Sequence, residues 1–184
     1  MDVWLSDFSL GLDLLHQRGG LYYFAFAFGA AVGSFLNVVI YRWPLELSIV
    51  RPRSHCPGCG RLIPWYWNIP VLSWLLLRGR CRWCGAKISL QYLAVELMGA
   101  GIAMLSLWRF GPHAPALFAF VFGAALLCGS VIDLHTRLLP DVITLGLIPL
   151  GLAAAFLPRD WMPGWPVSGT EAWVGALIGG GLFW

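Results

Sequence analysis

Five stretches of the chain are almost entirely apolar, and the polar residues gather between them. The apolar runs cover residues 21–41, 91–108, 114–132, 142–157 and 172–184. A helix needs about 20 apolar residues to cross a bilayer, so the first three runs are suited to membrane spans. The run at 91–108 is interrupted only by Glu96, and the run at 142–157 is shorter and contains Pro149. The pattern predicts an all-α polytopic membrane protein with about five transmembrane helices, the last of them incomplete.

Composition supports this class and excludes an ordinary soluble domain. Hydrophobic residues make up 59% of the chain and charged residues only 11%. A soluble domain carries about 25% charged residues, because its surface must be hydrated. We therefore expect a membrane domain in residues 91–184 and a first span at 21–41, joined by the polar segment 42–90.

The distribution of charge predicts the orientation. Residues 42–90 hold eight of the twelve basic residues and a single acid, Glu46. By the positive-inside rule this basic loop is cytoplasmic, so residues 1–20 are periplasmic and residues 133–141 are cytoplasmic. The basic residues also favour binding of the loop to the anionic headgroups of phospholipids. Because Trp65 and Trp67 indicate an apolar surface against the membrane, we expect no nucleic-acid partner.

Two pairs of cysteines lie within the basic loop. Cys56 and Cys59 form one C-x-x-C pair and Cys81 and Cys84 the other, with 21 residues between the pairs. This spacing lets four thiolates converge on one tetrahedral metal, which predicts a structural zinc site. Two disulfides and four unrelated buried cysteines are the alternatives, and a reducing cytoplasm disfavours disulfides. His55 could compete with Cys56 as a ligand.

Two acids flank the connection between the third and fourth apolar runs. Asp133 falls where an apolar helix meets the headgroup region, and Asp141 follows Pro140 at the expected start of the next helix. An acid at this depth is costly and commonly functional. Asp133 either pairs with His135, Arg137 or a loop arginine, or serves chemistry. Asp141 is better explained as a helix-start residue.

A carboxylate at the membrane surface suits peptide hydrolysis by a pair of aspartates. Two carboxyls that share a proton can activate water and protonate the leaving amine. Asp133 and Asp141 are eight residues apart with a proline between them, so one helix cannot bring them together, although a folded loop could. We therefore expect the partner of Asp133 to be absent from this sequence.

Five motifs occur in the order found in bacterial type IV prepilin peptidases, and the chain resembles that family over residues 21–184. They are GSFLNVVIYRWP at 33–44, the two cysteine pairs, NIPVLSW at 68–74, YLAVE at 92–96, and Asp133 followed by LPD at 139–141. The resemblance implies an inner-membrane aspartic protease that is also an N-methyltransferase. Such enzymes cut the leader from type IV prepilins or type II secretion pseudopilins at the cytoplasmic face. They then methylate the new N-terminus with S-adenosylmethionine.

The resemblance also assigns roles to residues. Asp133 matches the first catalytic aspartate, and Asp141 is a supporting candidate. The second aspartate of the family lies in a downstream Gly-x-Gly-Asp motif, which this sequence lacks. We therefore expect an N-terminal portion of a complete enzyme, inactive as a protease by itself. A non-catalytic scaffold with a zinc loop and a protein with methyltransferase activity alone are the alternatives.

Asn37 and Glu96 are the candidates for binding the methyl donor. Asn37 shares a helix face with Gly29, Gly33 and Tyr41, and this spacing is also typical of close helix packing. Glu96 either pairs with Arg42 or Asn37 or belongs to the methyl-transfer site. No glycine-rich strand–turn–helix loop is present, so the donor site must be unconventional.

Overall fold

The computed structural model describes the backbone of residues 2–183 and the side chains of residues 19–178. It confirms the all-α prediction, since no strand occurs in that part of the chain and only two isolated β-bridges are formed. The α-helices are α1 (Asp2–Arg42), α2 (Leu72–Leu76), α3 (Leu90–Phe110), α4 (Ala114–Thr136), α5 (Asp141–Phe156) and α6 (Gly169–Phe183). Two short 3-10 helices, η1 (Trp43–Leu45) and η2 (Trp65–Trp67), lie in the basic loop.

In the described residues each apolar run is helical apart from Leu157, and three helical segments are long and apolar enough to cross a membrane. These segments are Gly19–Leu45, Leu90–Phe110 and Ala114–Thr136. Helix α5 is apolar but has only 16 residues. Because a perpendicular span needs about 20 residues, the spans beyond three stay a prediction.

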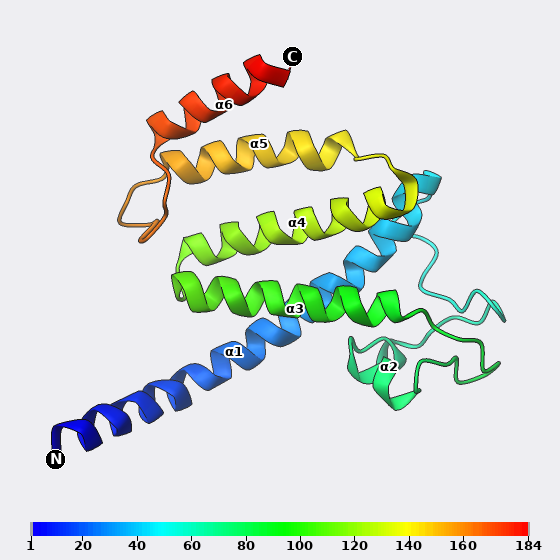
Figure 1. Cartoon of the computed structure of the whole chain (residues 1–184). Helices are drawn as coiled ribbons and strands as arrows, with labels where there is room; N and C mark the ends of the chain where they lie inside the picture. Colours follow the sequence, from blue (N-terminus) through cyan, green and yellow to red (C-terminus); the bar gives the residue numbers. More distant parts are fainter. Residues whose placement is uncertain (1, 184) are drawn as a thin grey trace.

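The helices form an antiparallel stack that α1 crosses obliquely. Figure 1 shows α3, α4, α5 and α6 side by side in chain order, with α1 running across α3 and α4. Consecutive helices in the stack alternate in direction because their connections are short. The basic loop and the α4–α5 connection consequently lie at the same end of the molecule.

Glycines set the close approach of α1 and α3. A Cβ atom on Gly29 would lie 2.5 Å from the carbonyl oxygen of Gly99, and one on Gly33 would lie 2.7 Å from the Cα of Glu96. Both distances are shorter than real Cβ contacts, so only glycine allows this spacing between the backbones. The predicted packing face of α1 is confirmed at Gly29, Gly33 and Asn37, whereas Tyr41 is exposed because α1 continues past the start of α3.

A small apolar core lies where α1, α3 and α4 meet. Ile40, Val95 and Ile132 are buried there, together with Cys128 and Val131. Cys128 is therefore a core residue, apart from the four cysteines of the basic loop.

Candidate functional site

The four cysteines of the basic loop converge at one point. The sulfur atoms of Cys56, Cys59, Cys81 and Cys84 all lie within 4.8 Å of one another. Each pair lies on a tight turn: the amide of Gly60 donates to the carbonyl of Cys56, and that of Gly85 to the carbonyl of Cys81. Both glycines have a positive φ, 69° and 71°, which glycine adopts without strain. The two turns are equivalent, as expected of paired zinc knuckles.

The electrostatics of this cluster favour a cation at its centre. Backbone amides of Cys84 and Trp83 that point at Cys81 lower the pKa of its thiol to about 6. The Ala86 amide favours the Cys84 thiolate, but burial and the neighbouring sulfurs outweigh it and raise the pKa of Cys84 to about 11. Four thiolates at these distances repel one another unless a metal ion neutralises them. The donor set and its geometry therefore fit a tetrahedral metal such as zinc. His55 is exposed and its ring contacts the Arg53 carbonyl oxygen, outside the cluster.

Glu96 attaches the basic loop to the membrane helices. It is buried on α3, and its carboxylate accepts a hydrogen bond of 2.6 Å from the amide of Val71, which precedes α2. Val71 has φ 63°, an unfavourable conformation for a β-branched residue. Of the partners considered from the sequence, neither Arg42 nor Asn37 pairs with Glu96, because both donate to backbone carbonyls instead.

Asn37 joins α1 to α3 by a polar contact. Its side-chain nitrogen donates to the Tyr92 carbonyl at 3.1 Å, while its Oδ1 atom is buried without a hydrogen-bond partner. A buried acceptor without a donor is costly, so Asn37 retains capacity for one more hydrogen bond. Whether Asn37 and Glu96 contact a methyl donor stays a prediction.

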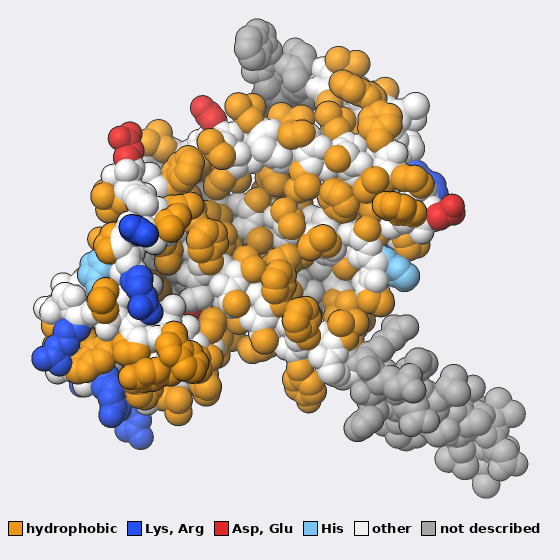
Figure 2. Space-filling view, turned by 180° about the vertical axis from the view of Figure 1, so that it is seen from behind, with side chains coloured by type: hydrophobic (Ala, Val, Ile, Leu, Met, Phe, Trp, Pro, Cys, Tyr) orange, Lys and Arg blue, Asp and Glu red, His pale blue; other side chains and the backbone are white. Residues whose placement is uncertain are grey.

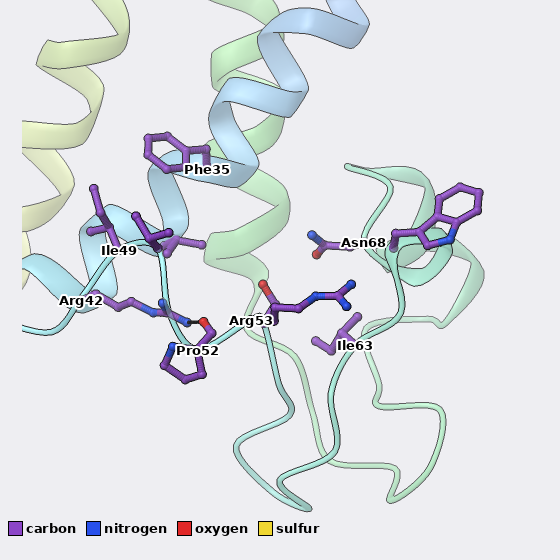
Figure 3. Close-up of a pocket in the computed structure, with 11 residues that line it drawn as sticks. Phe35, Arg42, Ile49, Pro52, Arg53, Ile63 and Asn68 are labelled. Carbon is purple, nitrogen blue, oxygen red and sulfur yellow. Dashed lines mark hydrogen bonds between the residues drawn. The ribbon is translucent and has the colours of Figure 1, made fainter.

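Arg42 fixes the segment that follows α1. Its guanidinium is buried and donates to the carbonyls of Ser48 and Pro52, each at 2.8 Å. The segment between them forms one wall of a cavity of about 220 Å³. Figure 3 shows Arg53 extending across this cavity between Asn68 and Ile63, with Arg42 bonded to Pro52 at its edge.

Asp133 lies on the last turn of α4, and its side chain is exposed. His135, one of its expected partners, is engaged within α4: its Nδ1 lies 2.7 Å from the Val131 carbonyl oxygen and carries the proton, because a carbonyl only accepts. The Arg137 amide caps the helix by donating to the Asp133 carbonyl at 2.7 Å. The Asp133 carboxylate therefore has access to water.

Asp141 occupies the first turn of α5, as expected for a helix-start residue. The helix begins at Asp141 because Pro140 is its N-cap. The Pro140 carbonyl accepts hydrogen bonds from the amides of Ile143 and Thr144. The structure thus places Asp133 and Asp141 at the two ends of one short connection.

A groove of about 510 Å³ lies beside that connection. Its walls come from η1 and the residues after it and from the end of α4 with the α4–α5 connection. Ile132 and Thr136, which flank Asp133 along α4, both line the groove, as does Glu46. The position of Glu46 at this groove could not be predicted from the sequence, because the groove joins segments that are distant in the chain.

The basic loop also presents apolar side chains to its surroundings. Trp65, Leu72, Leu75 and Leu76 are each about half exposed or more. Figure 2 shows most of the visible Lys and Arg side chains at one end of the molecule, next to a broad hydrophobic area. This combination is typical of a surface that lies in the headgroup region of a membrane.

Comparison with known proteins supports a single family. A family model described as the bacterial peptidase A24 N-terminal domain matches residues 27–110. A second, described as the type IV leader peptidase family, matches residues 120–184. No solved structure matches the chain.

Three similar proteins illustrate the relationship. A prepilin leader peptidase/N-methyltransferase of Xanthomonas campestris is 39% identical over 94% of this chain and 67% of its own length. A protein of the same name from Myxococcus xanthus is 49% identical over 72% of this chain and 40% of its own length. A type 4 prepilin-like proteins leader peptide-processing enzyme of Escherichia coli is 40% identical over 82% of this chain and 61% of its own length.

The chain thus spans 40% and 61% of the lengths of the last two relatives. The two matched segments nevertheless include both the basic loop and the helix that carries Asp133. This chain belongs to the type IV leader peptidase family.

Proposed function

We propose that this sequence supplies Asp133 to a membrane aspartic peptidase that removes leader peptides from type IV prepilins or pseudopilins. The observation that carries the proposal is the position of Asp133, exposed at the end of an apolar helix and beside a groove. The printed names of the relatives describe leader peptide processing. A substrate whose cleavage site lies at a membrane surface needs a carboxylate at this depth.

The chemistry requires Asp133 to share a proton with a second carboxylate. One carboxylate takes a proton from water, whose oxygen adds to the carbonyl carbon of the peptide bond. The C–N bond then breaks, and the protonated carboxyl delivers its proton to the leaving amine. Asp141 is a supporting candidate near the same connection, and the aspartate expected downstream in the family is the proposed partner.

We further propose that Cys56, Cys59, Cys81 and Cys84 bind zinc in a structural role. All four positions of a tetrahedral site are taken by protein sulfur, which leaves no open position for a substrate. Bound zinc would neutralise the thiolates and hold the two turns together. The loop could then keep its attachment to α3 through Val71 and Glu96.

The cavity beside Arg42 is the proposed site of S-adenosylmethionine. Its lining includes a cation, Arg53, an amide, Asn68, and a flat aromatic ring, Trp65, which suit a carboxylate, hydrogen-bonding groups and an adenine ring. The donor supplies a methyl group that passes from sulfonium to an amine. Asn37 and Glu96 lie outside the lining of this cavity, so their proposed effect on donor binding is indirect, through the packing of α1, α3 and the loop.

The cytoplasmic side is proposed for the basic loop and Asp133, and the periplasmic side for residues 1–20. The positive-inside rule supports this orientation. Labelling intact and broken cells with a membrane-impermeant thiol reagent, after introducing Asp160→Cys, tests it, and the unsubstituted protein gives the background from its own cysteines. We expect Asp160→Cys to raise the labelling above this background in intact cells; an increase only in broken cells would overturn the orientation.

Mass spectrometry of the substrate distinguishes this function from its alternatives. Membranes of cells that express the gene carrying this sequence are incubated with S-adenosylmethionine and either an intact or a pre-cleaved prepilin peptide. We expect loss of the leader from the first and methylation of both products. Methylation of only the pre-cleaved peptide would favour a methyltransferase alone, and no change in either would favour a scaffold.

A further inference from the structure

The groove beside the α4–α5 connection is lined mainly by apolar side chains. Trp43 and Leu47 line one side, and Leu138 and Leu139 line the other. All four are exposed, with relative exposures from 41% for Trp43 to 72% for Leu138. Such a concave apolar surface is suited to the side chains of a peptide, whose burial there would be favourable.

Among the residues with described side chains that line this groove, Glu46 alone carries a charge. Its backbone is fixed: its amide donates to the Trp43 carbonyl and that of Leu47 to the Arg42 carbonyl, each at 3.0 Å. Its φ of 55° is uncommon for a residue other than glycine. The negative charge is therefore held at the groove, within a loop that is otherwise basic.

Asp133 stands on the flank of the same groove. Ile132 and Thr136 are four residues apart on α4 and share the helix face that lines the groove. Asp133 follows Ile132 and is rotated by about 100° from it around the helix axis. A peptide in the groove would consequently run alongside the Asp133 carboxylate.

We propose that this groove binds an apolar peptide segment that carries a lysine or arginine, whose cation pairs with Glu46. The apolar side chains of the peptide lie on Trp43, Leu47, Leu138 and Leu139. Glu46 thereby sets the register that brings a peptide bond to Asp133. The proposal rests on the proposed peptidase function and adds the residue that selects a cationic substrate.

Binding measurements in lipid nanodiscs test the proposal without requiring catalysis. The probe is a fluorescent synthetic peptide with one lysine before an uncharged Leu/Ala-rich segment, and the readout is its anisotropy. Wild type is compared with Glu46→Gln and Glu46→Lys, and empty nanodiscs give the background. Asp160→Asn is the matched control, because Asp160 is exposed in the α5–α6 connection at the opposite end.

An ion pair at a partly enclosed site contributes up to about 1 kcal/mol, which is about 5-fold in Kd. We expect Glu46→Gln to raise the Kd of the lysine peptide by about that factor. The Kd of a control peptide in which glutamine replaces the lysine should not change. The Glu46→Lys variant should in turn bind a peptide that carries glutamate in place of its lysine more tightly than wild type does. Equal effects of Glu46→Gln on the charged and neutral peptides, or no effect, would overturn the proposal.

Cleavage assays with Asp133→Asn keep this proposal separate from the proposed function. Charge-dependent binding together with normal cleavage by Asp133→Asn would refute the peptidase role of Asp133 and leave the groove assignment standing. Loss of cleavage in Asp133→Asn without charge-dependent binding would refute the groove assignment alone.

Discussion

Replacing Gly99 by alanine should separate α1 from α3. The added Cβ atom would lie 2.6 Å from the carbonyl oxygen of Gly29 and 3.2 Å from the Cα of Gly33. Ordinary Cβ contacts begin at 3.4 Å, so the shorter distance is 0.8 Å too small. Both neighbours are backbone atoms and cannot rotate away. The helices must therefore move apart.

The cost follows from the contacts that this movement weakens. Overpacking of a close interface costs about 1–3 kcal/mol. The hydrogen bond from Asn37 to Tyr92, 3.1 Å long, lies next to the same contact and would lengthen. Polar contacts between membrane helices contribute about 0.6 kcal/mol each. We expect Gly99→Ala to lower the free energy of unfolding by about 2 kcal/mol.

Gly101→Ala is the matched control, because nothing lies within 4 Å of a Cβ atom at that position of the same helix. Both substitutions change helix propensity equally, so their difference isolates the contact. Unfolding in mixed micelles by increasing the fraction of SDS, followed by circular dichroism, measures both variants. Stabilities of Gly99→Ala and Gly101→Ala within about 0.5 kcal/mol of each other would refute the reasoning.

Three further predictions concern the polar contacts of the basic loop. Cys59→Ser should abolish zinc binding, while the control Cys128→Ser should retain the metal. Elemental analysis of the purified proteins measures both, and zinc in both variants would contradict the proposed four-cysteine site. Glu96→Ala leaves the half-buried Val71 amide without its acceptor and should cost about 1–3 kcal/mol, whereas Glu96→Gln keeps an acceptor and should lose less. Thermal unfolding compares the two variants, and equal melting temperatures would argue against the contact. In the Arg42→Lys variant the lysine cannot bridge the carbonyls of Ser48 and Pro52 as the planar guanidinium does. Proteolysis between residues 43 and 53 should therefore be faster than in wild type, and an unchanged rate would show that the bridge does not order this segment.

The helices and the cysteine cluster were predictable because their signals are local. Apolar runs mark the membrane segments, and a C-x-x-C pair with its glycine encodes a tight turn by itself. Run length nevertheless underestimates helix length: α1 begins at Asp2, although its apolar run begins at residue 21. Hydropathy reports where a helix leaves the bilayer, and the polar residues before that point do not end it.

The partners of the polar side chains were not predictable from residue types. Asn37, Arg42 and Glu96 all bind backbone groups, and every residue offers the same backbone groups. Their partners therefore depend on how α1, α3 and the loop are placed. The groove at Glu46 depends on the same placement, because its walls are more than 80 residues apart in the chain.

The central claim is that Asp133 carries the cleavage chemistry, and the rate of leader removal tests it most directly. Membranes of cells that express the gene carrying this sequence are given a prepilin peptide at saturating concentration, and kcat is compared among wild type, Asp133→Asn and Asp141→Asn. The account predicts that Asp133→Asn abolishes cleavage, while Asp141→Asn retains most of it because Asp141 begins a helix. Cleavage by Asp133→Asn at the wild-type rate would contradict the account.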